Sequence, residues 1–312
     1  MPTLHPEAED LLEELGDLNI PPAHAQSPSG AREASNQLFI DYRSDVPKAD
    51  VGKTHDITIE GSEAEIPARV YEPDGDGPHP ILIHYHGGGW VRGTIDTYDE
   101  FCRFLTREVG CLTIAPDYRR APEHPFPAAV VDSYDTLTWA NDYADEFDGD
   151  PSRIAVAGDS AGGNLSAVIS LMARDEGGPS IARQVLLFPA TNHAFDTPSY
   201  EEHADDPVLP KESMEWYWDH YLERELDGRH PYASPLQARE LGDLPPATVV
   251  TVGFDPLRDE GEAYANRLSE ADVPVNYVHY EDMFHLTHLF PELQRGQEMR
   301  DQIAAELEES LH

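Results

Sequence analysis

The sequence predicts an α/β protein with an eight-stranded, mostly parallel β-sheet flanked by helices. From about residue 55, short apolar runs alternate with amphipathic stretches, which is the pattern of strands crossed by helices. Most of these apolar runs are continuous in Val, Ile and Leu, as expected for strands that are covered on both faces. A chain of 312 residues is long enough for one large domain of this class with an added helical cap.

The predicted elements follow this alternation. Segments 55–59 and 66–71 are half polar and are separated by Gly61 and Ser62, so we expect an antiparallel hairpin at one edge of the sheet. The other predicted strands are 81–85, 112–115, 154–157, 185–188, 248–252 and 275–280. Helices are predicted over 98–109, 128–144, 161–174 and 259–270, and a last helix carries Ile303, Leu307 and Leu311 at i, i+4 spacing.

Two regions do not follow the alternation. Residues 1–50 hold a short acidic helical stretch, a Pro-rich break and an amphipathic stretch around Leu38, and residues 190–240 hold an insertion rich in acidic and aromatic residues. Open α/β sheets bind ligands at the carboxyl ends of their strands, and long insertions commonly serve a function. We therefore predict that both regions form a cap over that edge, and that 51–189 and 241–312 form the catalytic domain. A plain structural elaboration is the alternative.

The charge of the chain limits its partners. Asp and Glu number 60 against 21 Lys and Arg, giving a formal net charge of −39. Such a field repels phosphate backbones and anionic lipids, which argues against binding to nucleic acid or to a membrane surface. The acidic residues are spread along the whole chain, as in halophilic proteins, where salt screens the self-repulsion.

Other features suggest a cytoplasmic protein. Residues 1–16 are acidic and lack the basic and apolar regions of a secretory signal, and nothing approaches a transmembrane run. Cys102 and Cys111 make neither a disulfide framework nor a metal-ligand spacing, so we expect them to be small buried residues in a reducing compartment.

The strongest local motif is GDSAGG at 158–163, which directly follows a predicted strand and directly precedes a predicted helix. In this setting Gly-x-Ser-x-Gly predicts a nucleophile turn, because small flanking residues allow a sharp bend that raises the serine hydroxyl above the sheet. Ser160 then lies at a helix N-terminus, where the backbone dipole favours developing negative charge. We therefore predict Ser160 as the nucleophile.

A serine hydroxyl needs a base to take its proton, and the base needs an acid to hold its tautomer. Around such a turn the chain order is Ser, then Asp or Glu, then His. Asp255 follows the predicted strand 248–252, and His285 lies five residues past Tyr280, so these two are the predicted acid and base.

Each prediction has competitors. For the base they are His279, within a predicted strand, and His288, expected on the first turn of the last helix. For the acid they are Asp282 and the pair Asp259 and Glu260, which we expect to cap the helix that follows them.

A glycine loop, HGGGW at 86–90, follows the predicted strand 81–85. Consecutive glycines leave backbone N–H groups unobstructed, which suits donors to an oxyanion. We assign that site to the amides of Gly87 or Gly88, of Gly89 and of Ala161. The alternative is a loosened dinucleotide fingerprint ending at Gly93, with Asp117 as a ribose ligand, but the bulky residues 90–92 would block a pyrophosphate.

Together these motifs resemble those of the hormone-sensitive-lipase family of α/β-hydrolases, the bacterial and archaeal short-chain carboxylesterases. The matching segments are 86–90, 117–119, 121–123, 126–128, 158–164 and 255–261. The resemblance implies the α/β-hydrolase fold, a triad of Ser160, Asp255 and His285, an oxyanion hole at Gly87, Gly88 and Ala161, and a cap that shapes the acyl pocket. It also implies a homodimer through the edge of the last strand. The chain departs from the family where Leu286 and Thr287 replace the usual Gly and Phe after the histidine.

The expected activity is hydrolysis of short-chain acyl esters through an acyl-enzyme, with no metal or organic cofactor. Trp90, Asp159, Trp216 and Trp218 are the candidate substrate-binding residues, and the tryptophans could equally be core residues. An amidase or acyltransferase with the same triad, or a small-molecule receptor on the same fold, are the alternatives. The presence of all three triad residues favours hydrolysis over a pure binding role.

Overall fold

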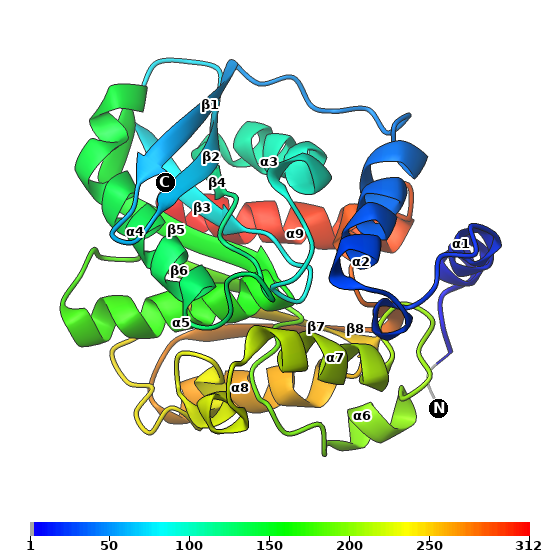
Figure 1. Ribbon diagram of the computed structural model, residues 1–312. Coiled ribbons are helices and arrows are strands. Elements are labelled where there is room, and N and C mark those ends of the chain that lie inside the picture. The colour runs from blue at the N-terminus through cyan, green and yellow to red at the C-terminus, as the bar shows by residue number, and fades with distance from the viewer. Residues whose placement is uncertain (1–2) are drawn as a thin grey trace.

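The computed structural model describes residues 3–312, which form one eight-stranded sheet with helices on both faces (Figure 1). In order across the sheet the strands are β1 (Lys53–Glu60), β2 (Glu65–Glu72), β4 (Leu112–Pro116), β3 (His79–Tyr85), β5 (Gly149–Asp159), β6 (Arg183–Leu187), β7 (Ala247–Phe254) and β8 (Val275–Phe284). β1 pairs antiparallel with β2, and β2 pairs antiparallel with β4, whereas β3 to β8 are parallel. The predicted sheet and its edge hairpin are confirmed.

The burial of each strand follows its place in the sheet. Edge strand β1 alternates between more and less exposed positions, whereas β3 is buried at every residue after His79. A strand with helices on both faces can be apolar throughout, which explains the continuous Val, Ile and Leu runs of the sequence.

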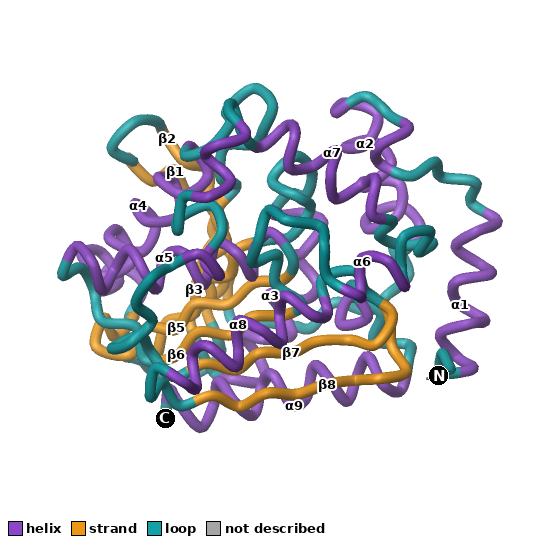
Figure 2. Tube along the Cα trace, turned by 90° about the horizontal axis from the view of Figure 1, so that it is seen from below, coloured by secondary structure: helices purple, strands orange, loops and turns teal. Residues whose placement is uncertain are grey.

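The helices that cover the sheet are α3 (Ile95–Val109), α4 (Ala128–Tyr143), α5 (Ala161–Glu176), α8 (Arg258–Glu270) and α9 (Gln294–Leu311). Successive side chains of β3 point to opposite faces. Leu82 shares an apolar cluster with residues of α3 and α9, whereas Ile81 and Ile83 share another with residues of α4 and α5. The sheet therefore lies between two helical layers, with α9 on one side and α5 and α8 on the other (Figure 2).

The helices of the two regions outside the alternation lie near one another at one side of the molecule (Figure 1). The first holds α1 (Pro6–Asp17), α2 (Pro28–Asn36) and a π-helical turn (Gln37–Tyr42), and the second holds α6 (Pro198–Glu202) and α7 (Lys211–Tyr221). Short 3-10 turns complete the chain at Ala23–Ala25, Ala144–Phe147, Glu225–Arg229, Pro235–Gln237 and Thr287–Leu289. His24 Nδ1 lies 3.0 Å from Ser213 Oγ, so the first region contacts α7 directly.

The two cysteines and the hydropathy of the helices agree with the fold. Cys102 and Cys111 are both free and buried, as predicted. Within residues 3–312, no helix has the length and hydropathy that a bilayer crossing requires.

The topology brings distant parts of the chain to one edge. β3, β5, β7 and β8 are parallel, so their carboxyl ends lie at the same edge of the sheet. His86, Ser160, Asp255 and His285 each directly follow one of these ends. β3 lies between β4 and β5, so the chain adds its next strand on one side of β3 and the following strand on the other side. Such a reversal of strand order leaves a crevice at the carboxyl ends of the strands.

The start of α5 packs very closely against the end of β3. A Cβ atom on Gly162 would overlap the carbonyl oxygen of Tyr85, and one on Gly158 would overlap the backbone of Gly162. Only residues without side chains allow this approach of backbone to backbone.

We predict that Gly162→Ala lowers the free energy of unfolding by about 1–3 kcal/mol, because the added methyl group must displace backbone. Urea denaturation measures this change. Gly16→Ala is the matched control, since a Cβ atom there meets nothing within 4 Å. Equal stability of Gly162→Ala and the unmodified protein would contradict the packing described.

Candidate active site

Ser160 lies on a strained turn between β5 and α5. Its backbone has φ 53° and ψ −117°, a conformation that residues other than glycine rarely adopt. Two hydrogen bonds hold the turn: Ser160 N donates to Leu187 O at 2.9 Å, and Ala190 N donates to Ser160 O at 3.2 Å. The side chain is thereby presented at the N-terminus of α5, as the motif predicts.

The structure brings Asp255 and His285 together. His285 Nδ1 lies 2.8 Å from Asp255 Oδ2, and the other oxygen, Oδ1, accepts from Leu257 N at 2.8 Å. Both side chains are buried. Because a carboxylate can only accept, this bond assigns the proton to Nδ1 and leaves Nε2 as the basic nitrogen.

The competing histidines lie elsewhere. His279 is within β8, and its Nδ1 lies 2.9 Å from Thr251 Oγ1. The expectation that His288 starts the last helix was wrong: it lies in the turn Thr287–Leu289, and α9 begins only at Gln294. Burial, reinforced by nearby His84 and Arg300, holds the pKa of His288 well below its usual value, so this side chain stays neutral.

The competing carboxylates have other partners. The expectation that Glu260 caps its own helix was wrong, because Glu260 Oε1 accepts from Thr191 N at 2.6 Å and from Asn192 N at 3.2 Å. Burial raises the pKa of Glu260 to about 8. Asp259 accepts from Ser199 N, and Asp282 forms an ion pair with Arg295.

The glycine loop requires one correction. Gly87 N donates to Asp159 Oδ1 at 3.2 Å, so this amide is already occupied. Gly88 and Gly89 have φ values of 116° and 60°, and within residues 3–312 no acceptor is found for their amides or for that of Ala161. These three N–H groups are the free donors of the predicted oxyanion site.

Asp159 supports the glycine loop, and its assignment to substrate binding stays a prediction. The side chain is 0% exposed and accepts from Tyr98 OH at 2.7 Å as well as from Gly87 N. Burial raises the pKa of Asp159 to about 6, against the opposing effects of Tyr98, His285 and His86. Sequence reasoning missed Tyr98, because no motif marks a single tyrosine on a distant helix.

The tryptophans assigned to substrate binding are packing residues. Trp90 and Trp218 are 0% exposed, and the Trp90 ring lies 4.6 Å from that of Trp218 and stacks on Tyr221 at 4.2 Å. Trp216 is half-buried and rests on His220 at 4.2 Å. None of the three lines the cavity next to the site.

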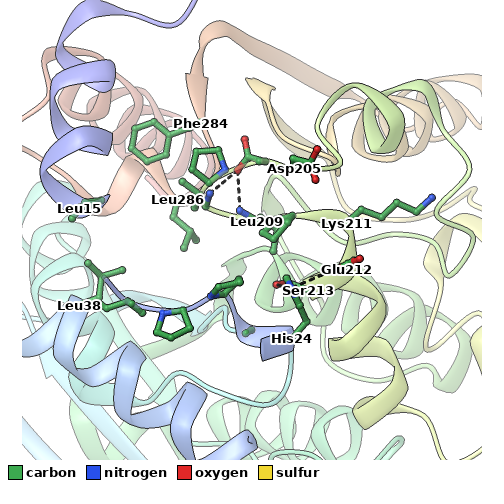
Figure 3. Close-up of a pocket in the computed structure, with 18 of the residues that line it drawn as sticks. Leu15, His24, Leu38, Asp205, Leu209, Lys211, Glu212, Ser213, Phe284 and Leu286 are labelled. Atoms are coloured by element: carbon green, nitrogen blue, oxygen red, sulfur yellow. Dashed lines mark hydrogen bonds and ion pairs between the residues drawn. The ribbon is translucent and has the colours of Figure 1, made fainter. Parts of the chain in front are cut away.

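That cavity has a volume of about 700 Å³ and lies between the N-terminal region, residues 204–217 and the two neighbours of His285 (Figure 3). Leu15, Leu38 and Leu286 face it from separate parts of the chain. Tyr217 also lines the cavity, and its ring lies so close to Gly89 that a Cβ atom on Gly89 would overlap it. The lining therefore includes Phe284 and Leu286, the chain neighbours of His285, whereas His285 and Ser160 themselves are not part of it.

Leu286 adopts a left-handed conformation, with φ 70°. This is the position where the family resemblance predicts glycine, the residue that suits such a φ. The backbone after His285 therefore has a conformation that suits glycine, although the residue there is leucine, for which this conformation is less favourable.

Comparisons with known proteins agree with this architecture. The α/β-hydrolase fold family model matches residues 82–289. The chain is 45% identical over 236 residues to the carboxylic ester hydrolase LipN of Mycobacterium tuberculosis, a match that covers 74% of this chain and 63% of that relative. It is 33% identical over 216 residues to an ethyl acetate hydrolase of Pseudomonas putida, covering 67% of each.

Solved structures agree as well. A hyperthermophilic esterase from Pyrobaculum calidifontis superimposes with a TM-score of 0.94 at 39% identity, covering 99% of both chains. The chain therefore belongs to the α/β-hydrolases, in the family of carboxylesterases that resemble hormone-sensitive lipase.

Proposed function

We propose that this protein is a serine carboxylesterase in which Ser160, His285 and Asp255 act as the triad. The observation that carries the proposal is the buried Asp255–His285 pair at the same sheet edge as the strained Ser160 turn. In this mechanism His285 Nε2 takes the proton of the Ser160 hydroxyl while the oxygen attacks the ester carbonyl. The tetrahedral intermediate then collapses, and His285 returns the proton to the leaving alcohol. Water repeats the sequence on the acyl-enzyme.

The amides of Gly88, Gly89 and Ala161 are the proposed donors to the oxyanion. They have no competing acceptor among the described residues, and Ala161 opens α5, where the helix dipole adds to the field. Donors fixed before the reaction need no reorganisation when the negative charge appears.

We propose that the substrate carries a short acyl chain. Trp90 and Trp218, two of the three tryptophans that suggested a small pocket, are fully buried, so the support comes from the ethyl acetate hydrolase among the relatives. The cavity of about 700 Å³ is within the range that holds small organic molecules, and we assign it to the larger substituent of the ester.

The free thiols of Cys102 and Cys111 suit a reducing compartment, which supports a cytoplasmic location. The edge strand β8 is our proposed site of homodimer formation.

Ser160→Ala tests the proposed nucleophile. Removing the hydroxyl leaves no atom to form the acyl-enzyme, so kcat for nitrophenyl acetate should fall by a factor of about 10⁴ or more. A fluorophosphonate probe should label the unmodified protein and not the variant. Undiminished turnover by Ser160→Ala would rule out the assignment, and product analysis separates ester hydrolysis from acyl transfer.

Asp159→Asn tests the support of the glycine loop. We expect kcat to fall roughly 10–100-fold, less than the loss of a whole oxyanion donor, because the loop shifts and its amides remain. Tyr98→Phe removes the same 2.7 Å hydrogen bond without changing the carboxyl group and should reproduce part of the loss.

The Asp159→Asn substitution should lower kcat but increase the free energy of unfolding relative to the unmodified protein as the pH rises. The folded protein holds the Asp159 proton more tightly than the unfolded chain, since the pKa rises from 3.8 to about 6. Ionisation of this carboxyl therefore lowers the free energy of unfolding as pH increases from about 4 to about 6. Asparagine has no such ionisation, so urea denaturation should show the variant gaining stability relative to the unmodified protein across this range. A constant difference would contradict a buried, ionising Asp159.

We expect activity and stability to increase with salt, from about 0.1 M to about 2 M KCl. Salt weakens the self-repulsion of a net charge of −39, and it also weakens exposed ion pairs such as Arg32–Glu123. Exposed pairs contribute only about 0–1 kcal/mol each, so relief of the net charge should dominate. Thermal denaturation and initial rates measure both effects, with sucrose as an uncharged control. Full stability and activity in dilute buffer would contradict the salt adaptation.

A further inference from the structure

A second cavity lies away from the proposed active site, and we propose that it binds the carboxylate of a small organic acid through Arg43. The cavity has a volume of about 740 Å³. Its walls come from the N-terminal region, α3, the segment 291–292 and α9. Among the described residues it shares no lining residue with the cavity next to His285, and nothing in the proposed esterase mechanism uses it.

Two buried arginines share one carboxylate at this cavity. Arg300 binds Glu100 through two hydrogen bonds of 3.0 and 2.6 Å. Arg43 reaches the same carboxylate at 3.5 Å, its only ion pair among residues 3–312, and the Arg43 side chain is 4% exposed. The guanidinium groups of Arg43 and Arg300 carry two positive charges, and the Glu100 carboxylate that they share supplies one negative charge.

The donors of Arg43 are largely unused. Its Nε is buried and has no hydrogen-bond partner, and the guanidinium lies over the ring of Phe290 at 5.5 Å. Burial, together with the charge of Arg300, lowers the pKa of Arg43 from its ordinary value, although Glu100 and Glu292 oppose this. Arg43 shares its one counter-ion with Arg300 and leaves Nε unpaired, and a buried charge that is only partly neutralised is costly, so the site favours an anion.

This deficit is unexpected in so acidic a protein. Carboxylates outnumber Lys and Arg by 60 to 21, yet Arg43 has no close carboxylate of its own. Glu14, Asp45 and Glu292 also line the cavity, but no oxygen of Glu292 lies within 4 Å of an Arg43 nitrogen.

The remaining cations of the cavity already have partners. Lys48 is bound to Asp99 at 2.8 Å, and Arg107 pairs with Glu108. Arg43, whose only ion pair within the described part of the chain is the longest of these at 3.5 Å, is therefore the cation most open to a ligand.

The apolar residues of the cavity wall indicate which substituent the organic acid would have. Val46, Pro47, Ala49, Phe104 and Pro291 line the same space, so an apolar body can lie next to the charged group. The planar guanidinium presents N–H donors in a fork that matches the two oxygens of a carboxylate better than it matches a spherical ion. A small acid with an apolar body, such as benzoate, is the appropriate probe.

The test is calorimetric titration of benzoate into the purified protein at constant ionic strength, with chloride as the spherical control. We expect saturable binding of benzoate and none of chloride. Arg43→Gln should weaken the affinity about tenfold or more, since one charge-assisted contact is lost, while Arg107→Gln at the same cavity should leave it unchanged. Ligand binding to the folded state should also raise the Tm of the unmodified protein.

Each other outcome overturns the proposal. Absence of saturable binding does so directly, and an equal response to chloride indicates general screening. Unchanged affinity in Arg43→Gln indicates binding elsewhere, including the proposed active site, so esterase activity plays no part in the outcome. Arg43→Gln keeps the Arg300–Glu100 pair, and Arg43→Lys serves if that variant does not fold. Lysine keeps the charge without the fork, and an affinity equal to that of arginine contradicts the proposed geometry.

Discussion

The close approach of the Ser160 turn to the end of β3 is the constraint on which the site depends. Gly158 and Gly162 let the start of α5 lie directly against the carbonyl groups of Tyr85 and His86. That contact fixes where the serine stands relative to the glycine loop that follows β3. A side chain at either glycine would force the start of α5 away from the end of β3. Packing density at one backbone contact thus controls the geometry of the chemistry.

Asp159 adds an electrostatic constraint to this packing. Its carboxylate is fully buried next to Ser160, and it directs Gly87 N and Tyr98 OH toward itself. The amide of Gly87 is thereby removed from the set of free donors, and the loop beyond it is fixed in a conformation that presents Gly88 and Gly89. Burying this charge costs stability, as its raised pKa indicates. The destabilising carboxylate lies next to the proposed active site, where it fixes the orientation of the glycine loop.

The sheet, the flanking helices and the family could be predicted from the sequence. Buried parallel strands appear in it as continuous apolar runs, and the family motifs directly follow the ends of those runs. It did not suffice where tertiary contacts decide which way a side chain points. Glu260 binds the segment after β6, Asp159 faces the loop, and Trp90 fills the core, none of which the local sequence determines. The same applies to Arg43, which shares Glu100 of α3 with Arg300 of α9, two elements far along the chain. The triad roles follow from order and placement at strand ends, and they stay predictions for the experiments above.

Leu286 shows how backbone and cavity are balanced in this chain. A left-handed conformation costs a residue with a Cβ atom roughly 1–2 kcal/mol, and glycine would avoid the cost. The leucine side chain, however, lines the cavity next to His285 and is buried there, which a glycine could not reproduce. Burying a leucine contributes about 1.5–3 kcal/mol, of the same order as the strain. The position can therefore hold leucine without loss of stability, and the side chain takes up part of the cavity that it lines.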